Sequence, residues 1–174
     1  RLDAYAQAHG VSRFMVLHAA LVVLLARLGA TDDVSVGTPV AGRGDRRLDN
    51  LIGMFVNTLV LRTPVDPAVG FDDIVATVRD VDLDAFAHVQ VPFEQVVEAV
   101  DPVRSQNSAP LFQVALSVEE AHPSDLELPG LRVEPIVPDF GIAKFDLEFT
   151  LRDDDGALAG TLTYATDLFD ASTA

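Results

Sequence analysis

Apolar residues cover nearly the whole circumference of a helix drawn over residues 13–28. Ser12 stands directly before this run, where its hydroxyl can accept a hydrogen bond from a free backbone N–H of the first turn. Gly29 follows the run, at a position where helices commonly end. The pattern therefore predicts a helix over residues 13–28 that is buried on most of its sides.

Two apolar runs that follow this helix predict strands. Residues 34–40 predict a strand that ends near Pro39, because proline cannot donate to a strand ladder. Residues 52–62 are apolar without clean alternation, which favours a strand covered on both faces of a sheet.

The spacing of apolar residues changes to a helical period between Phe71 and Val89. Asp72 and Asp73 fall in the first turn of that segment, where carboxylates complement the helix dipole. A second short helix is predicted over residues 93–100, with Pro92 at its start, since the N–H that proline lacks has no helical partner there.

The last third of the chain alternates apolar and polar residues with the period of a strand. Residues 111–119 and 144–152 show this alternation, and residues 153–156 form a turn signal that predicts a hairpin with residues 158–164. A further short strand is predicted over residues 131–137, within a loop rich in proline and acidic residues. The fold class predicted is an α/β (α+β) sandwich, with a mixed sheet flanked by helices.

Composition narrows the possible partners. The 174 residues carry a formal net charge of −15, so both nucleic acid and an anionic membrane surface would be repelled. The absence of cysteine excludes disulfides, thiolate metal sites and a cysteine nucleophile. Residues 1–8 lack the apolar segment of a secretory signal peptide, and we expect a cytoplasmic protein.

Few residues along the chain match a known catalytic or ligand-binding motif. The glycines of residues 37–44 match no nucleotide-binding spacing, and no nucleophile elbow is present. The four histidines are scattered without a partner at metal-ligand spacing, so no metal site is predicted. His18, inside the buried helix, is interpreted as a hydrogen-bonded core histidine.

A resemblance to a known family comes from five segments in order. Residues 34–43 and 52–58, which include Ile-Gly-Met-Phe-Val-Asn-Thr, resemble the fifth core motif of nonribosomal peptide synthetase condensation domains. Residues 88–94 resemble the sixth motif and residues 104–114 the seventh. Residues 143–147 and 164–170 resemble later stretches of the same family. Val89 and Gln90 depart from the usual sixth motif, which leaves the condensation subtype open.

The resemblance implies that residues 1–174 are the C-terminal lobe of a condensation domain, with the N-terminal lobe and the final helix missing. In the family, the His-His-x-x-x-Asp-Gly motif belongs to the preceding lobe, and it does not occur in these residues. The fold implied is a chloramphenicol-acetyltransferase-like lobe. No catalytic residue is assigned to this chain, and the fragment alone is expected to be inactive.

The function implied is peptide-bond formation between two thioesters, a donor acyl or peptidyl group and an acceptor amino acid. In the family, both are carried on phosphopantetheine arms of carrier proteins, so no cofactor is expected to bind the chain directly. The implied partners are the N-terminal lobe of the same domain, peptidyl carrier proteins and an adjacent adenylation domain.

Five residues are the candidates for the substrate channel or the lobe interface. Asn57 is the supporting catalytic candidate, because a buried amide needs partners and could steady the tetrahedral intermediate; pairing with backbone at a strand end is the equally weighted alternative. Arg43 could pair with a carboxylate across the lobe interface. Thr58, Phe112 and Gln113 complete the set, although Thr58 is also explained by structure and Gln113 by an ordinary strand surface.

Two other functions remain open. One is a condensation-like domain without catalysis that recruits a tailoring enzyme. The other is a relative that cyclises, epimerises or forms esters. The histidine motif of the other lobe would separate these functions.

Overall fold

The computed structural model of the protein describes residues 1–44, 46–48, 50–103, 105, 108–119, 131, 136, 141–154 and 157–174. Its helices are α1 (Leu2–His9), α2 (Arg13–Gly29), α3 (Phe71–Ala87) and α4 (Phe93–Val100), with a short 3-10 turn over Arg46–Leu48. Its strands are β1 (Asp33–Ala41), β2 (Val56–Pro64), β3 (Val114–Glu119), β4 (Leu147–Asp154) and β5 (Ala157–Tyr164).

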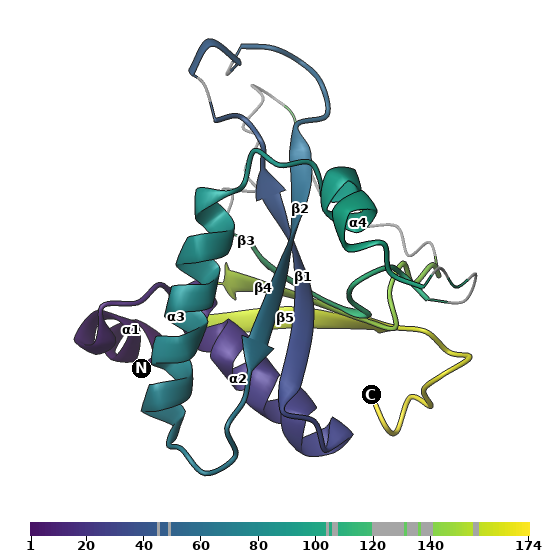
Figure 1. Ribbon diagram of the computed structural model, residues 1–174. Helices are drawn as coiled ribbons and strands as arrows, with labels where there is room; N and C mark the ends of the chain where they lie inside the picture. Colours follow the sequence, from purple (N-terminus) through teal and green to yellow (C-terminus); the bar gives the residue numbers. More distant parts are fainter. Residues whose placement is uncertain are drawn as a thin grey trace.

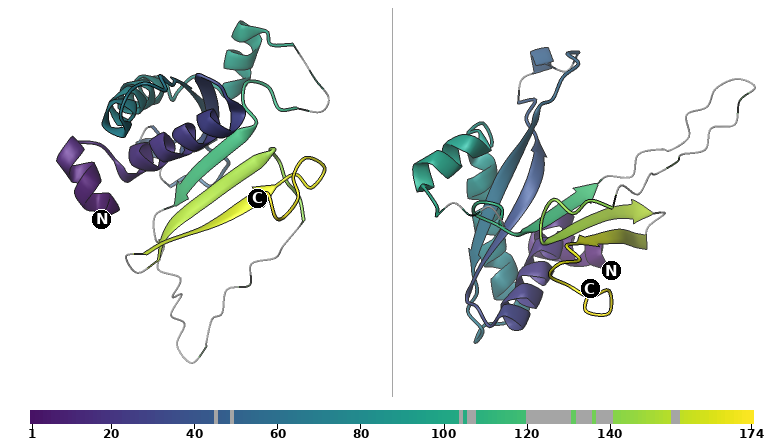
Figure 2. Two further views of the ribbon diagram at one scale, coloured as in Figure 1. Left: turned by 90° about the horizontal axis from the view of Figure 1, so that it is seen from below. Right: turned by 90° about the vertical axis from the view of Figure 1, so that its right-hand side faces the viewer.

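The described strands form one mixed sheet in the order β2-β1-β3-β4-β5. The pairs β1–β2 and β4–β5 are antiparallel, whereas β3 runs parallel to both β1 and β4. Helices α2 and α3 pack side by side against this sheet, and α4 lies beside β2 near the far end of α3 (Figures 1 and 2). The predicted fold class, a mixed sheet flanked by helices, is confirmed.

The main core lies between α2, α3 and the central strands. Val22, Val36, Val75 and Val78 are almost completely buried there, together with Leu116. Ser12 caps α2 as predicted, because its Oγ accepts a hydrogen bond of 3.2 Å from the backbone N–H of Met15. Helix α2 then includes Gly29, and Ala30 takes the left-handed conformation at its end, so the predicted end at Leu28 was one residue short.

Strand β2 differs from its prediction in two respects. It begins at Val56 rather than at residue 52, because β1 ends at Ala41, whose partner across the ladder is Val56. It is also an edge strand on which Leu59, Leu61 and Thr63 are buried on one face only, so the prediction of a strand covered on both faces was wrong. The apolar pattern alone did not show that the second face of this strand would be left without a covering layer.

Backbone constraints explain the other shifted boundaries. Leu111 has a positive φ of 70°, which interrupts the extended chain, so β3 begins at Val114 rather than at residue 111. Pro39 lies inside β1, not at its end, because β3 pairs with β1 only at Val36 and Gly37 and leaves that side of Pro39 without a ladder partner.

The predicted hairpin of the last third is confirmed by the antiparallel pairing of β4 with β5. Its turn at residues 155–156 lies outside the described residues, as does the strand predicted over residues 131–137 apart from Leu131 and Ile136. Among the described residues, no single helix is long and apolar enough to cross a membrane, whereas the bent pair α1 and α2 meets that test of length and composition together.

Candidate functional site

The end of β1, the start of β2 and the connection between α3 and α4 meet at one end of the sheet (Figure 1). The β1–β2 ladder continues one step beyond the strands, since the Gly42 N–H donates to the Phe55 carbonyl at 2.5 Å. A Cβ on residue 42 would lie 2.2 Å from that carbonyl oxygen, so only glycine allows this approach. The two strands are therefore held together up to the point where their loops diverge.

Asn57 joins this end of β2 to the α3–α4 connection. Its Nδ2 donates to the carbonyls of Val89 at 2.9 Å and Val91 at 2.8 Å, and its Oδ1 accepts from the N–H of Phe93 at 3.1 Å. Both amide protons are thus used by backbone carbonyls, while the oxygen retains one acceptor position. The geometry is that of a side chain that positions the first turn of α4.

A cleft of about 320 Å³ opens over this junction. Its lining includes Asn57 and Thr58 from β2, Gln90 from the α3–α4 connection, and Phe93 and Glu94 from the first turn of α4. Thr58, which is half-buried, also lines a second cleft of about 290 Å³ on the neighbouring part of the sheet. The two described clefts therefore share a wall at Thr58.

Phe112 lies in the wall of the second cleft. It is almost fully buried, and its ring centroid lies 5.8 Å from that of Phe93 and 5.0 Å from that of Phe145. The ring covers Gly37, where an added Cβ would come within 2.1 Å of it. This aromatic group connects α4 to the start of β3 and to the segment before β4.

Arg43 lies just beyond the end of β1, whereas Gln113 directly precedes β3, whose first residue pairs with Val36 near the start of β1. The guanidinium carbon of Arg43 lies 4.8 Å from the centroid of the Phe55 ring, a cation–π arrangement. Gln113 is exposed, and its Nε2 donates to the Ala109 carbonyl at 3.0 Å within its own turn. The structure thus brings Asn57, Thr58 and Phe112 together, with Arg43 one residue beyond Gly42.

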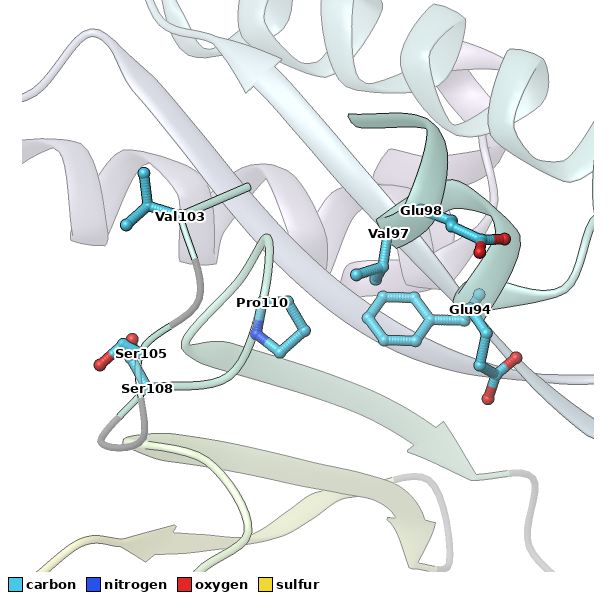
Figure 3. Close-up of a pocket in the computed structure, with 8 residues that line it drawn as sticks. Glu94, Val97, Glu98, Val103, Ser105, Ser108 and Pro110 are labelled. Atoms are coloured by element: carbon cyan, nitrogen blue, oxygen red, sulfur yellow. The ribbon is translucent and has the colours of Figure 1, made fainter. Parts of the chain in front are cut away.

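A third, larger groove runs along α4, and sequence reasoning missed it. Its volume is about 560 Å³, and Phe93, Val97, Val103 and Pro110 supply its apolar lining. Glu94 and Glu98 point outward from the helix at its rim (Figure 3). None of the residues of α4 is fully buried although the helix is strongly amphipathic, and this mismatch becomes visible only once the helix is placed on the fold.

The described acids and phenols with displaced pKa values lie away from these clefts. The guanidinium of Arg62 lowers the pKa of Asp33 at the start of β1, and Arg13 lowers the pKa of Asp3. Partial burial, and then the hydrogen bond to Asp72, raises the pKa of Tyr5 to about 12. No group of three metal-ligating side chains occurs among the described residues. The described side chains at the clefts thus offer hydrogen bonds and apolar walls.

The condensation domain family matches residues 1–174 of the chain. A probable non-canonical nonribosomal peptide synthetase of Salinispora arenicola is 48% identical over 170 residues, which is 97% of this chain and 2% of that protein. A dimodular nonribosomal peptide synthase of Bacillus subtilis is 42% identical over 180 residues, which is 100% of this chain and 8% of that protein. The chain thus spans only a small part of these relatives.

Solved structures of the same kind share the fold. The X-domain from teicoplanin biosynthesis superposes with a TM-score of 0.85 at 33% identity, covering 99% of this chain and 40% of that chain. A four-domain nonribosomal peptide synthetase bound to AMP and glycine gives a TM-score of 0.84 at 29% identity, covering 98% of this chain and 14% of that chain.

Proposed function

Because the chain belongs to the condensation domain family of nonribosomal peptide synthetases, we propose that it is the C-terminal lobe of a domain that forms peptide bonds between carrier-bound thioesters. The acceptor amine attacks the thioester carbonyl of the donor. A C–N bond forms, the C–S bond breaks, and the donor's phosphopantetheine arm leaves as a thiol that takes up the proton lost by the amine.

The observation that carries this proposal is the apolar surface at the end where the clefts open. Ile52 and Met54, just before β2, are 105% and 91% exposed, and Val103 beyond α4 is 99% exposed. Ile52 and Met54 lie two residues apart in the loop before β2, and exposed apolar side chains gathered in this way are typical of a surface that packs against another element. A second lobe that covers this end would close the open clefts into a channel.

The residues at this end then have distinct roles in the proposal. Asn57 positions the first turn of α4 and lines the same cleft as Thr58 and Phe93. Phe112 provides an apolar wall, and Arg43 supplies charge at the lobe boundary. Gln113 holds the turn before β3. The groove along α4 offers an apolar docking surface for a carrier protein. Because the chain carries a net charge of −15, an acidic carrier protein would be repelled electrostatically, and its docking would rest on apolar contacts.

The test uses the complete domain with its two loaded carrier proteins, and mass spectrometry of the product on the acceptor arm. We expect Ile52→Asp and Met54→Asp to lower the rate of condensation by on the order of tenfold or more, because the lobes lose their alignment. Leu28→Asp is the matched control, since Leu28 is 76% exposed at the end of α2. Equal rates for all three variants would contradict a lobe interface at residues 52–54.

A second candidate function is supported by one specific comparison. The structure of the X-domain in complex with OxyB from teicoplanin biosynthesis matches this chain with a TM-score of 0.84 at 34% identity, covering 99% of this chain and 38% of that chain. By analogy, a non-catalytic domain of this family could recruit a tailoring enzyme.

The His-His-x-x-x-Asp-Gly segment separates these two functions. Its presence in the preceding lobe, with condensation by the complete domain, supports peptide-bond formation. Replaced histidines, together with binding of a tailoring enzyme to the complete domain, support recruitment. Sequencing of the parent gene upstream of Arg1 and a binding assay with the purified domain give both answers.

A further inference from the structure

His18 of α2 and Asp82 of α3 form a polar contact inside the core. Neither side chain has any exposed surface, and Nδ1 of His18 lies 2.9 Å from Oδ1 of Asp82. They are the only ionisable side chains classed as buried in the described ranges. All other buried residues of the two helices are apolar, so this pair joins α2 to α3 at a single polar point.

Stability alone does not explain the pair. The contact uses one atom of each side chain, while Nε2 of His18 and Oδ2 of Asp82 are buried without a hydrogen-bond partner among the described atoms. Burial of polar groups that are only partly paired costs free energy. Apolar residues in place of a buried pair often leave a protein equally or more stable, whereas a polar pair can select one arrangement of its helices.

The spacing of residues along α3 shows which arrangements compete. The inward face of this helix carries Val75, Val78, Asp82 and Ala85, at intervals of three and four residues. A shift of α3 along α2 by one helical turn, about 5.4 Å, would bring Val78 or Ala85 opposite His18. Apolar contacts are not directional and discriminate weakly between such registers. The shifted register would separate two buried polar groups, each at the cost of an unpaired atom.

We propose that His18 and Asp82 act as a register pin, a buried hydrogen bond that fixes the position of α3 along α2. Asp82 lies in the last two turns of α3, where the neighbouring Val81 and Ala85 pack against the buried side chain of Leu61 and its apolar neighbours. The pin therefore acts on the half of α3 that leads to the candidate site.

The position of α3 sets the place of the α3–α4 connection. Val89 packs against the same apolar group as the end of α3, and its carbonyl accepts a hydrogen bond of 2.9 Å from Asn57. A shift of about 5.4 Å would carry this carbonyl out of hydrogen-bonding distance. For the proposed function, on which only this last step rests, His18 and Asp82 are positioning residues for the cleft that Asn57 lines.

The test is hydrogen exchange in the complete domain, with His18→Leu/Asp82→Leu as the main variant. The double substitution removes both polar groups together, so neither is left buried without its partner. The amide of Val22, within α2, reports the stability of the helical core, and the amide of Phe93 reports the contact with Asn57. We expect exchange at Val22 to be no faster than in the parent, and exchange at Phe93 to quicken on the order of tenfold.

Two further variants separate the register from general stability. Met15→Leu/Ile74→Leu changes only apolar contacts of the same two helices, and we expect both amides to exchange as in the parent. His18→Asn keeps a donor near the position of Nδ1 but loses the ring, so we expect faster exchange at Val22 and unchanged exchange at Phe93.

Three results would overturn the register pin. One is unchanged exchange at Phe93 in the double leucine variant. Another is loss of protection at Val22 in that variant, because the pair would then be required for stability. The third is acceleration at Phe93 in His18→Asn equal to that in the double leucine variant, because the hydrogen bond would then have no part in the effect.

The rate of condensation by the same variants tests the link to the proposed function separately. We expect the double leucine variant to lose rate on the order of tenfold, because the cleft is no longer held in one geometry, and Met15→Leu/Ile74→Leu to keep the parent rate. Faster exchange at Phe93 with an unchanged rate would support the register pin and contradict the assignment of this cleft to the proposed reaction.

Discussion

The two ends of this structure place similar residues in opposite surroundings. Where α2 and α3 cover the sheet, valines such as Val22 and Val78 have no exposed surface, and even a histidine and an aspartate are sealed from solvent. Where β1 ends and β2 begins, the apolar Ile52 and Met54 are exposed, and polar Asn57 donates both amide protons to backbone carbonyls and accepts from the Phe93 N–H. Hydropathy alone therefore does not distinguish buried from exposed residues here. Burial depends on whether a neighbouring helix or strand covers the residue.

The largest difference between the two ends is expected in the free energy of unfolding, when one apolar side chain at each end is shortened to alanine. Leu61→Ala leaves a cavity beneath α3, because Leu61 has no exposed surface, and we expect a loss of about 3 kcal/mol in the free energy of unfolding. Met54→Ala should change that free energy by no more than about 0.5 kcal/mol, as is usual for surface residues. Denaturant unfolding of the 174-residue chain measures both, and a comparable loss for Met54→Ala would show that the Met54 side chain is covered within the chain itself.

A second contrast concerns the Phe112 ring, which packs between Phe93 and Phe145. Gly37→Ala places a Cβ about 2.1 Å from the Phe112 ring and forces that ring away from Phe93 and Phe145. Overpacking of this kind is expected to cost about 2 kcal/mol. Gly44→Ala is the control, since no atom lies within 4 Å of a Cβ built there. Equal stabilities of the two variants would mean that the Phe112 ring moves freely.

Sequence patterns predicted the covered half better than the open end, for a physical reason. Long apolar segments indicate burial within the element itself, so α2 and α3 were predicted to within two residues at their ends. The Ser12 cap was also confirmed. The start of β2 depended on where β1 ends, and the start of β3 depended on the positive φ of Leu111. Neither feature is visible in a hydropathy pattern.

The candidate site was also predicted only in part from the sequence. The motif resemblance selected Asn57, and the structure shows that its amide bonds to the α3–α4 connection and to Phe93; a supporting catalytic role for Asn57 remains a prediction. The hydrogen bond between His18 and Asp82 was also not predicted, because 64 residues separate them in the sequence. The roles of Arg43, Thr58, Phe112 and Gln113 in a substrate channel remain predictions.

A smaller effect is expected from the link between Asn57 and the α3–α4 connection. Asn57→Ala leaves the Val89 and Val91 carbonyls and the Phe93 N–H without their partner, which should cost about 1 to 2 kcal/mol because the site is partly open to water. Asn57→Asp keeps the acceptor for Phe93 but turns a carboxylate oxygen toward two carbonyls, so we expect it to be at least as unstable. Hydrogen exchange of the Phe93 amide should quicken in both. An Asn57→Asp variant as stable as the parent would argue against the donor role of Nδ2.

The smallest effect belongs to the periphery of the covered half, where α1 is tied to α3. Tyr5 donates a hydrogen bond to Asp72, and His9 stacks on the Tyr5 ring. The folded pKa of Tyr5 is raised from 10.0 to about 12, by partial burial first and then by Asp72. A raised folded pKa means that this contact stabilises the fold below pH 10 and loses its contribution as the pH rises through about 12. Ultraviolet titration of the complete domain should show a phenolate transition near pH 12 that is absent from Tyr5→Phe. Because phenylalanine keeps the packing but cannot ionise, persistence of that transition in Tyr5→Phe would assign it to another tyrosine and leave α1 held by packing alone.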